Sequence, residues 1–255
     1  MQYSVLGGLG FIFAMTSLGA ATVFFFSKKT PKSMEKLSLG FAGGVMIAAS
    51  IWSLLIPAIE ETEAQGKPGW VPASAGFLLG AGFLFLLEGL ISRLRPSGET
   101  AFSKRTKLLF TAITLHNIPE GMAVGLAFAL TAVHGGDSGA FAAAAALSLG
   151  IGIQNFPEGA AVSLPMRQDG VSAGKAFAFG CLSGAVEPAA GILSFLAVGW
   201  IAPIMPWLLS FAAGAMLYVV FDELIPAAKG GRFGVGTLGA LAGFLIMMVL
   251  DVALG

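Results

Sequence analysis

Residues 108–132 read LLFTAITLHNIPEGMAVGLAFALTA, an apolar stretch with the polar motif HNIPEG (116–121) in its middle. A second apolar stretch, residues 139–166, carries QNFPEG (154–159) at a corresponding place, and the nine residues that begin at each motif are identical at six positions. The stretches have 25 and 28 residues, enough to cross a hydrocarbon core about 30 Å thick as an α-helix. They predict two membrane helices that share one polar motif.

The composition of the whole chain agrees with a membrane location. Of its 255 residues, 56% are hydrophobic and 11% are Asp, Glu, Lys or Arg, whereas soluble domains carry about 25% charged residues. The 14 basic and 14 acidic residues cancel, which argues against nucleic acid as a partner. We therefore expect an integral membrane protein surrounded by the lipid bilayer.

Eight apolar stretches are long enough to span the bilayer. None alternates with the two-residue period of a barrel strand, so the predicted fold class is an all-α integral membrane protein with eight transmembrane helices. The connections are short and rich in Pro, Gly or charge, which predicts a single transmembrane domain over residues 1–255. The predicted spans are residues 3–26, 37–59, 70–91, 108–132, 139–166, 173–200, 204–228 and 233–254.

Basic residues fall almost entirely at alternate connections between these spans. The first, third, fifth and seventh connections have thirteen Lys and Arg residues, and the even-numbered ones have only Lys67. Because positively charged loops stay in the cytoplasm, we expect the odd-numbered connections to be cytoplasmic and both termini to be extracytoplasmic. The predicted location is the plasma membrane, which in a bacterium is the inner membrane.

Further pairs of segments resemble each other. They are FAGGVM (41–46) with FAAGAM (211–216), LIPA (55–58) with LIPA (224–227) and, more weakly, LLE (86–88) with VLD (249–251). Paired segments lie an odd number of spans apart, so the members of each pair cross the membrane in opposite directions. We expect an inverted repeat, with helices 1–3 related to 6–8 and helix 4 related to helix 5, as is typical of transporters. The alternative is chance similarity between Gly- and Ala-rich helices.

Half of the acidic residues lie inside the predicted spans. A charged acid at the centre of a membrane helix costs roughly 2.5–3.5 kcal/mol on insertion scales. Lys and Arg lie at span ends and in connections, too far away to neutralise these acids. Their carboxyl groups are therefore either protonated or bound to a cation. The seven residues are Glu88, Glu120, Glu158, Glu187, Asp222, Glu223 and Asp251.

Residue counts from the cytoplasmic ends of the spans place six side chains at one depth. At about 1.5 Å per residue they lie roughly 13–20 Å from the cytoplasmic edge, near the middle of the membrane. Imidazole, carboxylate, amide and thioether groups suit Zn²⁺, Fe²⁺, Mn²⁺ or Cd²⁺ better than Ca²⁺ or Mg²⁺. Pro119 and Pro157 are expected to kink the helices beside these ligands. The six residues are Met46, His116, Glu120, Gln154, Glu158 and Glu187.

Other polar residues are expected nearer the two membrane surfaces. Glu88 and Glu223, with Asp222 beside it, lie close to basic residues at the cytoplasmic side, and Asp251 lies toward the outer side. We interpret these four acids, together with Ser53, as entrance and exit groups of a path through the central site. The alternative is that they are ordinary polar residues at helix ends.

These residues resemble the ZIP family of divalent metal-ion transporters. The resemblance covers essentially all eight spans and is strongest in HNIPEG (116–121) and QNFPEG (154–159), supported by LSGAVE (182–187) and DELIP (222–226). It implies import of Zn²⁺-like ions toward the cytoplasm as substrate, a homodimer, and movement of helices 1, 4, 5 and 6 against helices 2, 3, 7 and 8.

The resemblance also implies a two-metal centre. Asn155 stands where some members carry an acid, which weakens the expected second site, and residues 92–107 lack the histidines that many members have there. The main metal would be held by Met46, His116, Glu120, Gln154 and Glu158, and the second by Asn117, Asn155 and Glu187 with Glu120 and Glu158 shared.

Two other functions remain open from the residues alone. An intramembrane metallohydrolase would use Glu120 or Glu158 as a general base on a metal-bound water. A proton-conducting or structural membrane protein would keep its buried acids protonated and bind no metal.

Overall fold

The computed structural model describes residues 2–25, 31–93, 104–133, 138–230 and 234–254. These residues form helices and short turns, without any strand in the part described. The elements are α1 (Gln2–Ala21), η1 (Thr22–Phe24), α2 (Lys32–Ala49), η2 (Ser50–Leu55), α3 (Ile56–Ala64), α4 (Trp70–Arg93), α5 (Lys104–Val133), α6 (Ser138–Gln168), α7 (Ala173–Gly184), α8 (Val186–Leu196), α9 (Val198–Ile201), η3 (Ala202–Ile204), α10 (Met205–Val219), η4 (Val220–Leu224), α11 (Ile225–Ala228) and α12 (Val235–Leu254).

Along the described chain these elements form eight successive helical runs, in agreement with the predicted number of spans. Seven of the runs are long and apolar enough to cross a membrane. α5 is not among those seven, although it is 30 residues long; it begins with Lys104, Arg105 and Lys107 and contains the polar motif. α5 contacts α6, α8 and α10, so its polar motif lies within the protein rather than against lipid.

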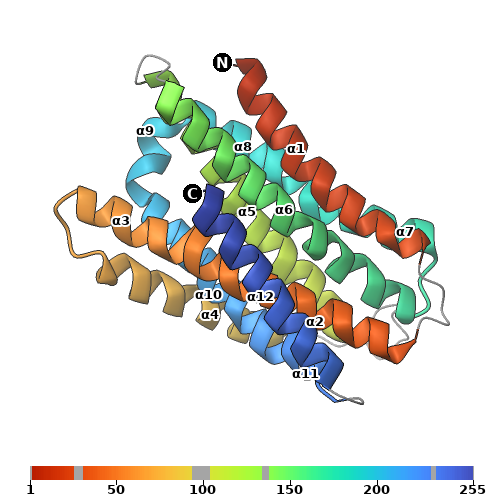
Figure 1. Ribbon diagram of the computed structural model, residues 1–255. Helices are drawn as coiled ribbons and strands as arrows, with labels where there is room; N and C mark the ends of the chain where they lie inside the picture. Colours follow the sequence, from red (N-terminus) through yellow and green to blue (C-terminus); the bar gives the residue numbers. More distant parts are fainter. Residues whose placement is uncertain (1, 26–30, 94–103, 134–137, 231–233, 255) are drawn as a thin grey trace.

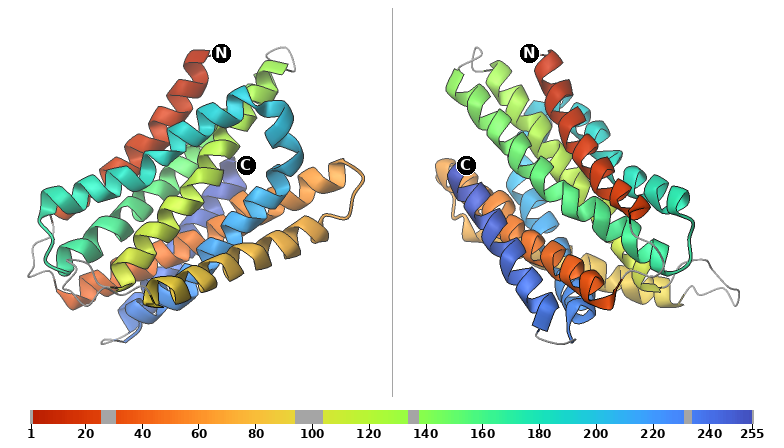
Figure 2. Two further views of the ribbon diagram at one scale, coloured as in Figure 1. Left: turned by 180° about the vertical axis from the view of Figure 1, so that it is seen from behind. Right: turned by 45° about the vertical axis from the view of Figure 1, so that its right-hand side comes forward.

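The helices pack as two groups (Figures 1 and 2). In one group α2 lies along α12 and α4 lies along α10, and in the other α1 lies along α6 and α5 lies along α8. Contacts of α5 with α10 and of α6 with α2 join the two groups. The start of α1 and the end of α12 lie toward the same end of the bundle.

Within the first group the helices approach each other closely at glycines. At each of these positions a Cβ atom would overlap the backbone carbonyl oxygen of the facing residue. Small residues allow such close backbone contact between membrane helices. The pairs are Gly44 with Ala240 and Gly243 with Phe41 between α2 and α12, and Gly214 with Phe77 and Gly80 with Phe211 between α4 and α10.

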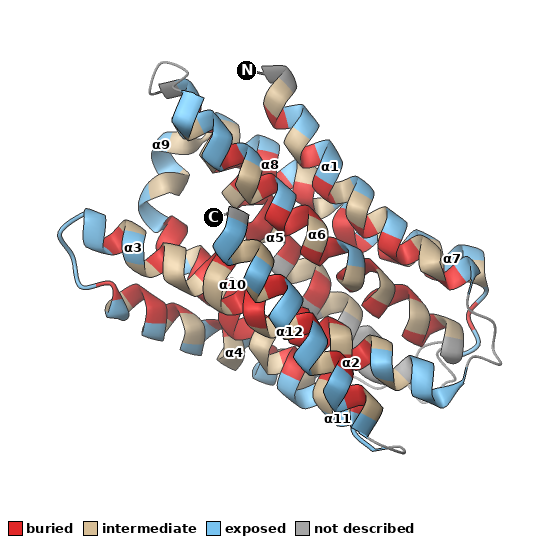
Figure 3. Ribbon diagram, in the orientation of Figure 1, coloured by how far each residue is buried: buried red, intermediate tan, exposed pale blue. Residues whose placement is uncertain are grey.

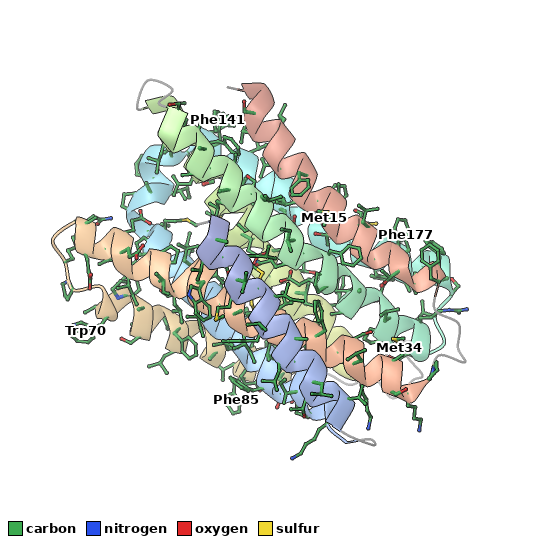
Figure 4. All side chains as sticks on the ribbon, viewed as in Figure 1. Met15, Met34, Trp70, Phe85, Phe141 and Phe177 are labelled. Carbon is green, nitrogen blue, oxygen red and sulfur yellow. The ribbon has the colours of Figure 1, made fainter. Side chains whose placement is uncertain are left out.

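Buried residues face the interior of the bundle, and the outer surfaces of the helices carry exposed side chains (Figure 3). Trp70 and Phe85 extend from the outer surface of α4 (Figure 4), and they are 70% and 64% exposed. Exposed residues of this size would be unfavourable in water but are suited to contact with lipid tails.

Prolines mark where the helical runs are interrupted. The sixth run breaks at Ala185 between α7 and α8, because Pro188 has no backbone N–H to donate to the Gly184 carbonyl, as a regular helix would require. The second and seventh runs widen into the π-helical segments η2 and η4 just before Pro57 and Pro226. By contrast, α5 and α6 continue through Pro119 and Pro157 as single helices.

One boundary between spans differs from the prediction. The sixth run ends at Leu196 and the next begins at Val198, so residues 198–200 belong to the seventh run rather than to the sixth. The predicted spans, 173–200 and 204–228, left residues 201–203 as the connection. In the structure Pro203 lies at the start of the short helix η3, where the missing N–H of proline does not disturb the helix.

Candidate metal centre

The first motif lies in the middle of α5. Asn117 and Glu120 are fully buried, and the Asn117 side chain donates a hydrogen bond to the Ser183 carbonyl of α7 at 2.9 Å. His116 belongs to α5, but its side chain lies outside the described residues. The α5 motif therefore presents a carboxylate and an amide to the interior of the bundle.

The second motif lies on α6 and meets the first. Gln154, Asn155 and Glu158 are fully buried. The side-chain amide of Gln154 donates a hydrogen bond to Oε1 of Glu120. This bond brings together two of the residues that the sequence assigned to one central site.

Glu187 completes the group from α8. It lies in the first turn of that helix, directly after the break at Ala185, where the helix N-terminus favours a negative charge. Its Oε1 accepts a hydrogen bond of 2.9 Å from Thr16 of α1. A Cβ at Gly121 would overlap the Glu187 backbone carbonyl, so glycine at this position allows α8 to approach the α5 motif.

The three carboxylates are close enough to repel one another. Glu120 interacts electrostatically with Glu158 and Glu187, Glu158 also acts on Glu187, and the Asn155 amide faces the Glu187 carboxylate. All three acids have no exposed surface. Like charges buried together are unfavourable unless protons or a cation compensate them.

Several buried oxygen atoms near these carboxylates are available as ligands. Within the described part of the chain, no hydrogen-bond donor reaches Oδ1 of Asn117, Oε1 of Gln154, Oδ1 of Asn155 or Oε2 of Glu187. Buried polar atoms of this kind are costly unless they are paired. Amide and carboxylate oxygens are ligands for divalent ions, and this donor set therefore fits a cation.

The described side chains do not by themselves form a closed metal cage. Among them, no group of three His, Cys, Asp or Glu residues is arranged to hold a metal ion. The ligand set expected from the sequence also includes the His116 imidazole, which is outside the described side chains, and amides.

Met46 lies in an apolar part of the interior. It is fully buried in a cluster with Met122 and Met216. The Ser50 hydroxyl lies 2.7 Å from the Met46 carbonyl and 3.0 Å from the Met216 sulfur. The role of Met46 as a metal ligand stays a prediction.

Among the expected entrance and exit residues, Ser53 and Asp251 contact each other, and Glu88 has a partner outside the expected set. Ser53 of η2 donates a hydrogen bond to Asp251 of α12 at 2.8 Å. Tyr218 of α10 donates one to Glu88 of α4 at 2.5 Å. Asp222 and Glu223 lie in η4, with Asp222 exposed and Glu223 half-buried.

Sequence reasoning missed Thr16 and Tyr218, which bind Glu187 and Glu88. Thr16, which is followed by Ser17, and Tyr218 both lie in largely apolar stretches, where hydroxyl groups such as that of Thr16 commonly bond to their own helix. Their acidic partners lie 171 and 130 positions away, so spacing along the chain gives no sign of these contacts.

The fold and the site define a multi-pass α-helical membrane protein whose centre is suited to a cation. Residues 99–251 match the family model described as ZIP zinc transporter. The chain is 39% identical to zinc transporter ZIP11 of Xenopus tropicalis, over 99% of this chain and 97% of that protein. It is 37% identical to zinc transporter ZIP11 of Homo sapiens, with 99% and 98% covered.

A bacterial relative, zinc transporter GufA of Myxococcus xanthus, is 38% identical over 94% of each chain. The protein therefore belongs to the ZIP family. This is a family of membrane transporters rather than enzymes, which excludes the intramembrane hydrolase.

Proposed function

We propose that this protein carries Zn²⁺ across the plasma membrane into the cytoplasm, through a central site formed by α5 and α6 together with α2 and α8. The observation that supports this most is the burial of Glu120, Glu158 and Glu187 together, with Gln154 hydrogen-bonded to Glu120. A divalent cation would offset the mutual repulsion of these carboxylates. Zinc is the substrate named for the relatives in both vertebrates and bacteria.

The proposed ligands are those of the sequence analysis. Amide oxygens are weaker ligands than thiolates or several imidazoles, and a mixed set of this kind can release the ion it binds. Fe²⁺, Mn²⁺ and Cd²⁺ overlap with Zn²⁺ in ligand preference and are expected to compete. We assign Met46, His116, Glu120, Gln154 and Glu158 to the main metal, and Asn117, Asn155 and Glu187, with the shared Glu120 and Glu158, to a second.

The close glycine contacts support the proposed inverted repeat. Gly44 and Gly214 occupy the same position in FAGGVM and FAAGAM, and each meets a backbone carbonyl of a neighbouring helix. Those carbonyls belong to Ala240 and Phe77, which are 163 positions apart. Glu88 and Asp251, in the LLE and VLD pair, have the same separation. The contact of α2 with α12 thus has a counterpart in the contact of α10 with α4.

The proposed direction, import, is the one that the family resemblance implies. The proposed orientation in the membrane rests on the thirteen basic residues at the odd-numbered connections, which favour a cytoplasmic position for those connections. Ser53 and Asp251 would then lie on the outer part of the path, and Glu88, Asp222 and Glu223 on the inner part. A homodimer, which the family resemblance implied, is tested by the mass of the purified protein in detergent.

Uptake by proteoliposomes tests the proposal. The purified protein should move Zn²⁺ into vesicles that contain a fluorescent zinc indicator, and Fe²⁺, Mn²⁺ and Cd²⁺ added outside should slow this uptake. Uptake should be lost in Glu120→Ala. If Zn²⁺ does not enter, or if Glu120→Ala transports as well as the unmodified protein, the proposed site is wrong. Proton flux without metal flux would favour the proton-conducting alternative.

A further inference from the structure

The hydrogen bond between Thr16 and Glu187 joins α1 to the central site. Thr16 Oγ1 lies 2.9 Å from Oε1 of Glu187 and 3.2 Å from the carbonyl oxygen of Ile12, one turn earlier in α1. Thr16 and Glu187 both have no exposed surface. The bond is therefore shielded from water, which would otherwise compete for the hydroxyl and the carboxylate.

Two helices pack closely against Thr16 at glycine residues. A Cβ at Gly184 would lie 2.7 Å from Cγ2 and 3.1 Å from Oγ1 of Thr16, so α7 packs directly against this side chain. A Cβ at Gly159 would overlap the backbone carbonyl of Thr16, so α6 packs against its main chain. The threonine hydroxyl thus has little freedom to point elsewhere.

Thr16 and Glu187 have equivalent positions relative to the two motifs. Gly121 follows Glu120 and meets the backbone carbonyl of Glu187, while Gly159 follows Glu158 and meets the backbone carbonyl of Thr16. Each motif therefore places its glutamate one residue before a close contact with one end of the Thr16–Glu187 pair.

The two carboxylate oxygens of Glu187 have different surroundings. Oε1 accepts from Thr16, while Oε2 is buried with no hydrogen-bond donor in the part of the chain that the structure describes. The Asn155 amide and the Glu158 carboxylate both act on Glu187. Since Thr16 engages one oxygen, the other is left to the ligands of α6.

We infer that Thr16 is a positioning residue, which orients the Glu187 carboxylate so that Oε2 serves the transported metal. This inference rests on the proposed function and extends it to a residue outside both motifs. A hydrogen bond from an outer group to a metal ligand fixes the orientation of that ligand. Thr16 has this relation to Glu187.

The second acceptor explains how the bond can open during transport. A hydroxyl has one proton to donate, and the Ile12 carbonyl is within reach when Glu187 turns away. Thr16 then keeps a hydrogen bond to its own helix, and no buried donor is left unpaired. Serine has the same two acceptors available, whereas valine matches the shape of threonine without the hydroxyl.

The test compares Zn²⁺ uptake by proteoliposomes with Thr16→Val, Thr16→Ala and Thr16→Ser. Both variants without the hydroxyl should raise the KM for Zn²⁺ about tenfold, the lower end of the effect typical for outer partners of a metal ligand. Thr16→Ser should restore the unmodified KM. Thr131→Val is the matched control, because Thr131 is buried and its hydroxyl donates a hydrogen bond to the Ala127 carbonyl of its own helix.

A double-mutant cycle separates a positioning role from a packing role. If Thr16 acts through Glu187, then Thr16→Val should not raise KM further in a Glu187→Gln background. An unchanged KM in both Thr16→Val and Thr16→Ala, or effects of Thr16→Val and Glu187→Gln that multiply, would overturn the inference while leaving the proposed function intact. Failure of the unmodified protein to take up Zn²⁺ would instead overturn the proposed function and, with it, the role of Thr16.

Discussion

Glu120 accepts its hydrogen bond from Gln154, which lies 34 positions later in the other motif. At the scale of single residues, this bond and the burial of Glu158 and Glu187 define the chemistry of the site. The carboxylates are held together although their charges repel. A substitution that removes one charge but keeps the shape of the side chain should therefore affect binding and stability in different ways.

Glu120→Gln and Glu158→Gln should lower Zn²⁺ uptake at least about tenfold, because even outer partners of metal ligands account for 10- to 100-fold changes. The Tm of the metal-free protein should not fall, since one of the repelling buried charges is lost. Uptake assays and thermal unfolding in detergent measure the two effects. Glu63→Gln, at an exposed position of α3, is the control and should change neither. Normal uptake in both motif variants would contradict the assignment.

The Ser53–Asp251 pair allows the charge of an outer group to be separated from its hydrogen bond. Asp251→Asn keeps an acceptor for Ser53 but removes a negative charge, and should raise the KM for Zn²⁺ severalfold at low ionic strength and less at high ionic strength. Ser53→Ala keeps the charge and should leave KM nearly unchanged. Equal effects of the two substitutions would show that the pair only stabilises the contact between η2 and α12.

At the scale of elements, small residues and prolines decide how the helices meet. The prolines at positions 57, 188 and 226 coincide with interruptions of their helical runs, and the glycines at positions 121 and 159 coincide with the closest approaches to Glu187 and Thr16. The ligands are thus carried on helices whose spacing depends on the absence of a side chain.

Gly121→Ala should destabilise the contact between α5 and α8, because the added methyl group overlaps the Glu187 carbonyl. Overpacking of this kind costs roughly 1–3 kcal/mol, and each kcal/mol lowers Tm by about 2–4 °C in a chain of this size. Zn²⁺ uptake should fall as well, since Glu187 is displaced. Thermal unfolding and uptake assays measure both.

Gly82→Ala provides the control for this substitution. Gly82 lies in α4, and a Cβ there would have no atom within 4 Å, so Tm should stay the same or rise with the higher helix propensity of alanine. If Gly121→Ala behaves like Gly82→Ala, the close approach of α8 is not needed for the site.

At the scale of the whole molecule, the charges are separated although the net charge is zero. Thirteen of the 14 basic residues lie at alternate connections, and half of the acidic residues lie within the predicted spans. This separation supports one orientation in the membrane and leaves the interior with a need for positive charge, which the transported ion would supply.

Cysteine labelling tests this orientation. In a Cys181→Ser background, which removes the one native cysteine, Lys67→Cys should react with a membrane-impermeant maleimide in intact cells. Lys175→Cys should react only after the membrane is permeabilised, and both positions are exposed on the protein. The reverse pattern would contradict the assignment of odd-numbered connections to the cytoplasm.

Hydropathy and local spacing determined much of this protein from its sequence alone. The eight helical runs follow from apolar stretches, because the bilayer requires helices of this length. The two motifs could be recognised because HNIPEG and QNFPEG share most of their residues. The burial of Glu120, Gln154, Glu158 and Glu187 agrees with their predicted place inside the spans. Positions within one helix are related by a fixed rise and turn, so such features can be read from the chain.

Only the tertiary structure decided which helix faces meet. The bond from Thr16 to Glu187 joins residues 171 positions apart, and that from Ser53 to Asp251 joins residues 198 positions apart. The break at Ala185 and the π-helical segments η2 and η4 were also outside the predictions. A helix that is apolar on all sides can turn any of its faces toward lipid at little cost in free energy. Its contacts with other helices therefore depend on close packing at glycines and on the pairing of the few buried polar groups. Those groups find their partners only when the whole bundle is packed.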